Sequence, residues 1–306
     1  MIPVSVIEEL RALLGEGNLL IDEPMAAHTT FRVGGPADGF ATPDSIEAVA
    51  AVAGLCRSEG VPLYVMGCGS NLLVADGGLR GVVLRIGPKL GSIRVQGAVV
   101  EAQAGATNAK IARTVLAEGL GGFEFAAGIP GSIGGAAIMN AGAYGGELRD
   151  VARAVICLTP EGEVVRLGAD EADWGYRRSM MGERGYIVLA VELELSPDDP
   201  QAIRECMDDL AARRSEKQPL DMPSAGSTFK RPEGHFAGKL IQDAGFQGYR
   251  VGGAQVSPKH AGFVVNAGGA TAADVRQLMD EVAAGVAQRF GVELQPEVRL
   301  WGFEED

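Results

Sequence analysis

The chain has 306 residues, a length that favours two domains and allows three at about 150 residues each. Its composition is 46% hydrophobic and 22% charged, which supplies enough apolar material for packed cores and excludes an intrinsically disordered chain. The formal net charge is −13 and no run of Lys or Arg opposes it, so a general binder of nucleic acid or of anionic membranes is disfavoured. Glycine, at 44 residues, is about twice its usual share, which indicates many backbone positions that need glycine.

The N-terminus predicts a helix over residues 1–14 and no signal peptide, because no basic segment precedes its apolar residues and Glu8 and Glu9 interrupt them. The uncharged stretch 125–146 holds seven glycines and Pro130, and is too broken for a membrane helix.

Scattered cysteines without a C-x-x-C pair predict neither a metal site nor a disulfide framework and favour a reducing, cytoplasmic compartment. They are Cys56, Cys68, Cys157 and Cys206.

The first third of the chain predicts alternating helices and strands. A helix over 44–59 is expected to start with a capping box of Asp44 and Glu47 and to stop at Gly60. Further predicted elements are strands at 62–66 and 82–86, a strand pair within 92–104 that turns at Gly97, and a helix over 107–119.

The second half begins with a predicted hairpin whose strands, near 151–160 and 163–167, flank Glu161 and Gly162. A long strand over 186–196 and a charged helix over 201–217 follow, and the helix is expected to mark a domain boundary. Residues 218–306 have the size of a small second globular unit, with a helix at 271–290 and a last strand near 297–301.

A glycine-rich loop, GCGSNLLV at 67–74, follows the strand predicted at 62–66. Its glycines let successive N–H groups point into a concavity, and Ser70 and Asn71 add donors, as phosphate oxygens require. No Gly-Lys-Ser/Thr follows, and Leu72 occupies the third glycine position of the Rossmann fingerprint, so neither a Walker loop nor an NAD-binding Rossmann domain is indicated. A tight turn after a strand is the alternative interpretation.

A second glycine-rich segment covers 128–146, where GIPGSIGGAA is followed by NAGAYGG. Such a segment lets backbone approach a flat or phosphorylated ligand, with Asn140 and Tyr144 as possible polar contacts. The alternative is a packed, glycine-bearing helix with loops. Two neutral glycine-rich loops without a nucleoside triphosphate signature favour a dinucleotide cofactor such as FAD.

Three polar residues outside these loops would not mark a site when taken singly. Ser227 lies among small residues, where serine usually serves a turn or a cap, and it lacks the G-x-S-x-G elbow of a hydrolase. Glu297 would ordinarily be a surface carboxylate or a partner of Arg299. Arg177 would ordinarily be solvated.

Taken together and in order, eight segments make the chain similar to the UDP-N-acetylmuramate dehydrogenase family, also called UDP-N-acetylenolpyruvoylglucosamine reductase (MurB). The matching segments are HTTFRVGGPAD (28–38), GCGSNLLV (67–74), AGIPGSIGGA (127–136), NAGAYG (140–145), WGYRRS (174–179), PSAGSTFKRP (223–232), AGKLIQDAG (237–245) and PEVRLWG (296–302). The resemblance implies a mixed α+β and α/β fold, with a two-lobed FAD-binding region of the vanillyl-alcohol-oxidase or PCMH type and a C-terminal α+β substrate domain. The implied limits are 1–66 for the first lobe, to which the last residues return, 67–200 for the second lobe and 201–300 for the substrate domain.

The resemblance implies non-covalent FAD, NADPH as electron donor and UDP-N-acetylglucosamine enolpyruvate as substrate, in peptidoglycan precursor synthesis and hence in cell shape and division. NADPH reduces FAD, flavin N5 delivers hydride to the enolpyruvyl β-carbon, and a proton is added at the α-carbon. The implied FAD contacts are Gly67, Cys68, Gly69, Ser70, Asn71, Leu72, Gly128, Ile129, Pro130, Gly131, Ser132, Gly135, Asn140 and Gly142.

Three residues match the family's catalytic positions: Ser227 as proton donor, Arg177 as the contact of the enolpyruvyl carboxylate, and Glu297 as the group that orients or assists proton delivery. Substrate contacts are expected from Arg177, Arg214, Lys217, Lys230 and His260. The short spacing from Glu192 to Ser227, and Arg231 in place of an asparagine, match the shorter family type without a tyrosine-bearing loop. A monomer or weak oligomer is expected, with no nucleic-acid or membrane partner.

Two alternatives stay open at this point. A flavin oxidase or dehydrogenase of the same fold that acts on another substrate would share both glycine-rich loops. A protein without a cofactor, whose glycines only shape the backbone, would stay colourless after FAD is added.

Overall fold

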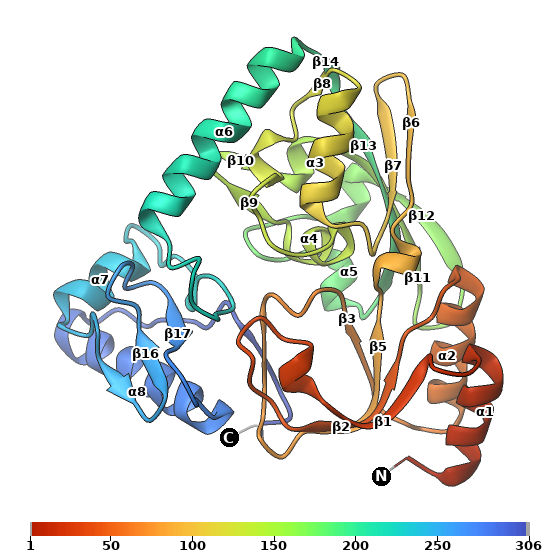
Figure 1. The fold of residues 1–306 in the computed structure, drawn as a ribbon, viewed down its shortest axis with the longest axis horizontal. Coiled ribbons are helices and arrows are strands. Elements are labelled where there is room, and N and C mark those ends of the chain that lie inside the picture. Colours follow the sequence, from red (N-terminus) through yellow and green to blue (C-terminus); the bar gives the residue numbers. More distant parts are fainter. Residues whose placement is uncertain (1, 304–306) are drawn as a thin grey trace. The chain divides into compact units, whose positions relative to one another are not determined.

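The computed structural model describes residues 2–303, so Met1, the first residue of the helix predicted over 1–14, lies outside them (Figure 1). The described residues form two compact units. Unit 1 contains the residues up to Leu20 together with Gly39–Cys68 and Gly81–Arg214, and unit 2 contains Ile21–Asp38, Gly69–Arg80 and the residues from Ser215 onward. Each unit is thus assembled from segments that lie far apart in sequence, and the lobe limits at 66 and 200 stay a prediction.

Unit 1 is built on an antiparallel sheet with the strand order β12-β11-β13-β7-β6. Both hairpins expected from the sequence are present in it, with positive φ at the turn glycines Gly97 (60°) and Gly162 (95°). The strands are β6 (Ile93–Gln96), β7 (Val99–Gln103), β11 (Ala152–Leu158), β12 (Val164–Gly168) and β13 (Ile187–Glu194). The sequence-based strands at 92–104, 151–167 and 186–196 are confirmed.

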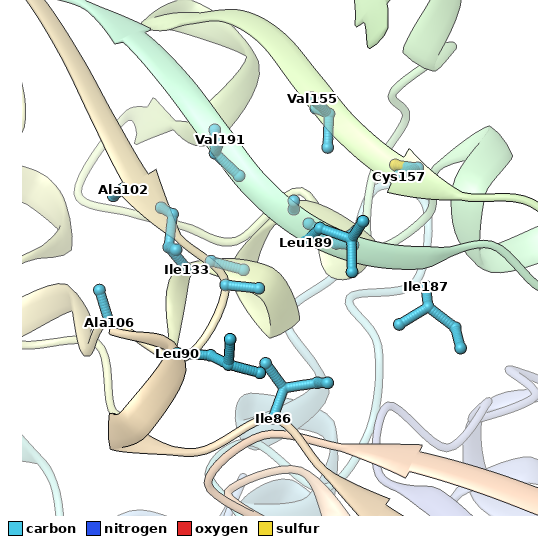
Figure 2. Packing of buried hydrophobic residues seen from close by; sticks show 14 of the residues in the cluster. Ile86, Leu90, Ala102, Ala106, Ile133, Val155, Cys157, Ile187, Leu189 and Val191 are labelled. Carbon is cyan, nitrogen blue, oxygen red and sulfur yellow. The ribbon is translucent and has the colours of Figure 1, made fainter. Parts of the chain in front are cut away.

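Helix α4 (Ile133–Met139) packs against β13 and β7 of this sheet. Ile133 is fully buried in one core with Leu189 and Val191 of β13 and Ala102 of β7 (Figure 2). Helix α4 lies inside the glycine-rich segment 128–146, which therefore does contain the packed, glycine-bearing helix of the alternative interpretation.

Helix α3 (Asn108–Ala117) belongs to the same unit and confirms the helix predicted over 107–119. The Thr107 side chain caps it by accepting the N–H of Lys110. Helix α1 (Val4–Leu14) packs on α2 (Ile46–Ser58).

The cap of α2 corrects the sequence analysis. Ser45, and not Asp44, is the N-cap: its hydroxyl accepts the N–H of Ala48 over 3.1 Å. Serine and aspartate are about equally good caps, so the pattern alone could not separate neighbouring candidates.

A four-stranded sheet has the order β1-β2-β5-β3, and its β3 and β5 run parallel. Its strands are β1 (Leu19–Pro24), β2 (Pro36–Ala41), β3 (Leu63–Met66) and β5 (Leu79–Arg85). The strands predicted at 62–66 and 82–86 are β3 and β5. Strand β3 ends where the first glycine-rich loop begins.

Unit 2 contains a three-stranded antiparallel sheet, β15-β16-β17, against which α8 packs. Its elements are α7 (Ala237–Asp243), β15 (Arg250–Val251), β16 (Ala254–Val256), β17 (Val264–Asn266) and α8 (Ala272–Phe290). In the same unit β18 (Arg299–Trp301) pairs in parallel with β4 (Leu72–Val74). The helix predicted over 271–290 and the last strand are therefore confirmed.

The remaining elements are short, apart from the exposed helix α6, and most carry no clear sequence pattern. They are β8 (Leu120–Gly121), β9 (Gly142–Ala143), β10 (Gly146–Glu147), α5 (Met180–Glu183), β14 (Ser196–Pro197), α6 (Pro200–Lys217) and the 3-10 turns η1 (Met25–Ala27), η2 (Pro88–Leu90), η3 (Glu124–Ala126), η4 (Leu148–Asp150) and η5 (Ala169–Ala172). Helix α6 was expected over 201–217 and is present. Every helix in the described part of the chain is too short or too polar to cross a lipid bilayer.

Candidate active site

The two glycine-rich loops meet within unit 1, at Gly67 and Ser132. A methyl group placed on Gly67 would lie 2.4 Å from Ser132 Oγ, closer than any real side chain approaches. Ser132 itself is 3% exposed. A side chain at position 67 would therefore force the Ser132 hydroxyl to move.

Three successive amides at the start of the first loop stay available for a ligand. Among the described residues, no acceptor pairs with the N–H groups of Gly67, Cys68 and Gly69. Gly69 has a φ of 64°, and its carbonyl accepts the N–H of Thr30 over 3.1 Å. Successive amides that have no protein acceptor are the donors that a phosphate or a flavin ring can use.

Cys68 lies within this loop with its side chain partly buried. Burial raises the pKa of its thiol, and Arg85 acts in the opposite direction. Cys68 is thus a neutral thiol at pH 7 and contributes a weak donor and packing.

In the second loop, Gly134 packs against the protein and Gly135 faces outward. A methyl on Gly134 would lie 2.8 Å from Ala104 Cβ, whereas a methyl on Gly135 would meet no atom within 4 Å. The buried Asn108 forms two hydrogen bonds with the loop. Its backbone N–H donates to the Gly131 carbonyl, and its Nδ2 donates to the Ile129 carbonyl over 3.3 Å. The loop is therefore fixed in place while Gly135 faces open space.

Arg177 lies in unit 1 on a tight turn, where its φ of 57° places it in the left-handed region. Gly175 and Arg178 close the turn as an isolated bridge. The Arg177 guanidinium lies 5.2 Å from the ring centroid of Tyr176, and its Nη2 donates to the Gly142 carbonyl over 3.4 Å. A non-glycine residue held in this conformation is a strained position of the kind that gathers at functional sites.

Ser227 and Glu297 lie in unit 2 on adjacent segments. The Glu297 N–H donates to the carbonyl of Thr228 over 2.8 Å, directly beside Ser227. Thr228 is 1% exposed, and its Oγ1 accepts the N–H of Val264 over 2.9 Å. Ser227 itself is exposed. The structure thus brings two of the three predicted catalytic residues together on a rigid backbone, with the serine hydroxyl accessible.

Asn71 joins the first glycine-rich loop to the Glu297 segment, again within unit 2. Its Nδ2 donates to the Glu297 carbonyl over 3.0 Å, and its own carbonyl accepts the N–H of Arg299 over 3.0 Å. These bonds continue the parallel pairing of β4 with β18. Sequence analysis identified Asn71 only as a possible ligand donor, because no local pattern reveals a partner 226 residues later.

The expected substrate contacts fall into different units. Arg214 lies in unit 1 against the second glycine-rich loop, where a methyl on Gly128 would be 3.2 Å from Arg214 Cδ. Burial lowers the pKa of the Arg214 guanidinium. A partly desolvated cation packed beside a glycine backbone is suited to an anionic ligand.

The other three predicted contacts, Lys217, Lys230 and His260, belong to unit 2. Lys217 is exposed and Lys230 is half-buried. Burial lowers the pKa of His260, whose Nδ1 accepts the N–H of Gly262 over 3.1 Å. His260 is therefore neutral at pH 7 and offers an Nε2–H donor instead of a positive charge.

Comparison with known proteins places this geometry in a family. The C-terminal domain model of UDP-N-acetylenolpyruvoylglucosamine reductase matches residues 218–301, and an FAD-binding domain model matches residues 37–168. The UDP-N-acetylenolpyruvoylglucosamine reductase of Clostridium botulinum is 50% identical over 302 residues, which cover 99% of this chain and 98% of that protein. The chain belongs to the UDP-N-acetylenolpyruvoylglucosamine reductase family. As a member, it is an FAD-dependent oxidoreductase.

Solved structures support the same assignment. The crystal structure of the family's MurB enzyme from Thermus caldophilus matches with a TM-score of 0.80 at 33% identity, covering 92% of this chain and 98% of that one. Alkyldihydroxyacetonephosphate synthase matches with a TM-score of 0.51 at 18% identity over 64% of this chain and 41% of that one, which shows a shared fold alone. The predicted two-lobed FAD-binding region with a C-terminal reductase domain is confirmed.

The residues of unit 1 fit the cofactor. The amides of Gly67 and Cys68, which have no acceptor among the described residues, suit the FAD diphosphate, and the open face at Gly135 leaves backbone instead of a side chain toward a ligand. The individual contacts stay predictions from the sequence.

Sequence reasoning missed Thr228 and the partners of Asn71, since neither has a local signal.

Proposed function

We propose that this chain catalyses the NADPH-dependent, FAD-mediated reduction of UDP-N-acetylglucosamine enolpyruvate to UDP-N-acetylmuramate. The observation that carries the proposal is the match along 99% of the chain to a named reductase, at 50% identity and without large insertions on either side. We further propose that the reaction serves peptidoglycan precursor synthesis in the cytoplasm, and through it cell shape and division.

Bound FAD supplies the redox chemistry, because it takes up two electrons from NADPH and passes them on to the substrate alkene as a hydride. The chain's own residues must then hold the alkene, stabilise the negative charge that develops on the enolpyruvyl group, and deliver one proton.

Arg177 is the proposed partner of the enolpyruvyl carboxylate. A guanidinium binds a carboxylate through two parallel hydrogen bonds, and the same fork stabilises the enolate that develops when hydride arrives at the neighbouring carbon. Its fixed turn and its contact with Tyr176 restrict the side chain before substrate binds. Less conformational entropy is then lost on binding.

Ser227 is the proposed proton donor to the α-carbon. A serine hydroxyl is a weak acid, but a carbanionic enolate is basic enough to take its proton. Glu297 is the proposed assistant, since its backbone is hydrogen-bonded beside Ser227 through Thr228. The hydroxyl is exposed while Ala225 and Phe229, two residues away on either side, are buried, so the segment presents the serine outward.

The UDP diphosphate is proposed to bind cationic and donor groups from Arg214, Lys217, Lys230 and His260. Arg214 carries a partly desolvated charge, and His260 contributes a neutral Nε2–H.

The proposal is tested by separating the two half-reactions in Ser227→Ala under anaerobic conditions. Flavin reduction by NADPH should stay within about twofold of the unsubstituted enzyme, whereas flavin re-oxidation by the enolpyruvyl substrate should slow by about 100-fold or more. Ser224→Ala, three residues earlier on the same segment, is the matched control and should change neither rate. Equal losses in both half-reactions of Ser227→Ala would remove Ser227 from proton delivery.

A further inference from the structure

Asn140 is a fully buried polar residue at the point where the second glycine-rich loop ends. It is 0% exposed, and its φ of 42° and ψ of 59° terminate α4 in the left-handed conformation. Asparagine tolerates this conformation better than most residues, so a helix end is a sufficient reason for its backbone. It does not explain why the side chain is buried among polar partners.

The Asn140 amide is engaged at both ends within unit 1. Its Oδ1 accepts the N–H of Arg149 over 3.0 Å. Its Nδ2 donates to Glu147 Oε2 over 2.6 Å and to the Gly175 carbonyl over 3.2 Å. The amide therefore connects the end of α4, the η4 turn and the turn that carries Arg177.

Two further bonds attach the Arg177 turn to the same end of α4. Trp174 Nε1 donates to the Ala137 carbonyl over 2.8 Å, and Ser179 Oγ donates to the Ile138 carbonyl over 2.8 Å. Both acceptors are carbonyls of the last helical turn, and the Ala137 carbonyl also accepts the N–H of Asn140 over 3.4 Å. Residues 174–179 are thus attached to α4 before, at and after the turn.

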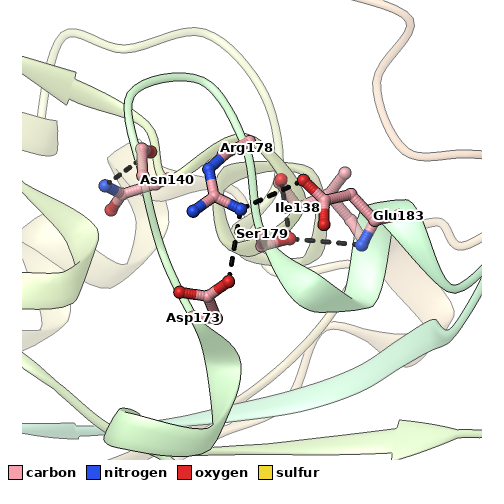
Figure 3. A network of polar contacts seen from close by, with 8 residues as sticks. Ile138, Asn140, Asp173, Arg178, Ser179 and Glu183 are labelled. Carbon is pink, nitrogen blue, oxygen red and sulfur yellow. Dashed lines mark hydrogen bonds and ion pairs between the residues drawn. The ribbon is translucent and has the colours of Figure 1, made fainter.

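Arg178, the residue after Arg177, forms ion pairs with Asp173 and Glu183 at the surface (Figure 3). Arg178 Nη1 lies 3.2 Å from Asp173 Oδ2 and 3.1 Å from Glu183 Oε1. These groups are about half exposed, so the pairs contribute little to stability. Asn140, like Trp174 and Ser179, makes its bonds away from solvent, and its amide is the group among the three that bonds the Gly175 carbonyl within the turn.

We propose that Asn140 is a positioning residue that fixes the Arg177 guanidinium relative to the glycine-rich loop, in place of the cofactor contact expected from the sequence. The inference rests on the proposed function, because it assigns Arg177 to the substrate carboxylate. The Asn140 amide donates directly to the Gly175 carbonyl in the backbone of the Arg177 turn. The Arg177 guanidinium donates to the carbonyl of Gly142, which pairs in the β9–β10 ladder with Glu147, the other acceptor of the Asn140 amide. Misplacing a binding group by about 1 Å can cost about 100-fold in rate.

The first test is Asn140→Asp, which keeps the shape and exchanges the amide donor for a second carboxylate beside Glu147. Repulsion between two neighbouring carboxylates raises the pH at which the pair takes up a proton, while Arg149, whose Nη2 lies 2.5 Å from Glu147 Oε1, opposes this shift. The proton taken up as the pH falls can restore one of the two lost donor bonds. We expect re-oxidation of reduced flavin by substrate to be about tenfold slower, or KM about tenfold higher, near about pH 8, with recovery toward about pH 6. The bound flavin content, read from the visible spectrum, should be unchanged.

Asn140→Asp/Glu147→Gln is the rescue variant, since the Gln amide can donate to the Asp carboxylate. Its substrate half-reaction should be faster than that of Asn140→Asp and should lose the acid-dependent recovery. A purely structural role for Asn140 would not produce this charge-dependent pattern.

Asn140→Gly guards against a variant that does not fold. Glycine adopts the left-handed conformation without strain, so it keeps the helix end and deletes only the amide. We expect the same loss in the substrate half-reaction, now independent of pH, with NADPH reduction within about twofold of the unsubstituted enzyme.

The outcomes separate the two proposals. If Arg177→Lys slows the substrate half-reaction while Asn140→Gly and Asn140→Asp leave it and KM unchanged, the positioning role is wrong and the proposed function stands. If Arg177→Lys itself changes nothing, the proposed carboxylate contact fails instead. Loss of flavin from Asn140→Gly would overturn the positioning role in favour of a cofactor contact.

Discussion

At the scale of a single residue, substitution of Arg177 tests the proposed contact between its guanidinium and the substrate carboxylate. Its two parallel N–H donors match a carboxylate, and Lys replaces them with a compact ammonium. We expect Arg177→Lys to leave flavin reduction by NADPH within about twofold and to slow flavin re-oxidation by substrate by about 10- to 100-fold, measured by anaerobic stopped-flow absorbance.

Arg184→Lys is the matched control for this substitution. Arg184 is exposed seven residues further along, at the end of α5, and the same chemical change there should affect neither half-reaction. Turnover that is insensitive to Arg177→Lys would exclude a guanidinium contact with the substrate.

Single residues of the site were predictable only as a set. Ser227, Arg177 and Glu297 each have an ordinary structural interpretation, and only their order along the chain indicated a site. The structure adds the bond between the Glu297 N–H and the Thr228 carbonyl, which depends on how two distant segments pair. No pattern in the local sequence contains that information.

At the scale of the elements, the approach of the two glycine-rich loops makes a sharp prediction. Gly67→Ala places a methyl 2.4 Å from Ser132 Oγ, and overpacking of this kind costs about 1–3 kcal/mol. We expect the Kd of the apoprotein for FAD to rise by about tenfold or more, measured by quenching of flavin fluorescence.

Ser132→Ala in the Gly67→Ala background removes the hydroxyl that the methyl would meet. The double variant should bind FAD more tightly than Gly67→Ala does, with Ser132→Ala alone as the reference for any direct contact of Ser132. If the double variant binds FAD no better than Gly67→Ala, the loops do not interact through this contact.

The N-terminus of α8 predicts a pH dependence of stability. The Asp274 carboxylate accepts the N–H groups of Thr271 over 3.0 Å and of Gly253 over 3.2 Å, and these bonds lower its pKa below the ordinary 3.8. Because the pKa is depressed in the folded state, the stabilisation is complete above the unfolded-state value and is lost as the pH falls through the folded-state value.

Asp274→Asn should therefore lower the free energy of unfolding by up to about 1 kcal/mol at pH 7, since solvent screens this carboxylate. The difference from the unsubstituted protein should shrink below pH 3.8, measured by urea denaturation across pH. Asp280→Asn, which removes an exposed i,i+4 ion pair with Arg276 on the same helix, is the control and should change stability by a few tenths of a kcal/mol. A difference for Asp274→Asn that is constant across pH would contradict the assigned cap.

Long elements were predictable and short ones were not. The strands at β7 and β13 and the helices α3 and α8 have clear periodicity, turn glycines or caps, so the sequence located them closely. The three-stranded sheet β15-β16-β17 has strands of two or three residues that long-range pairing stabilises. Such strands have too few residues to show an alternating pattern.

For the molecule as a whole, the mixed fold with its FAD-binding region followed from the order of the motifs, while the division into units did not. Each unit takes segments from the first 80 residues, so that Asn71 and Glu297 share a unit although 226 residues separate them. Parallel pairing of β4 with β18 produces this arrangement, and pairing between distant segments is decided by tertiary packing.

The most direct test of the whole interpretation is the visible spectrum of the purified protein, recorded without oxygen, after NADPH and again after UDP-N-acetylglucosamine enolpyruvate. We predict a flavin spectrum that NADPH bleaches and that this substrate restores, because the two additions drive opposite half-reactions on one cofactor. Bleaching without restoration would contradict the proposed substrate. A protein that shows no flavin spectrum even after FAD is added would contradict the cofactor and the site built around it.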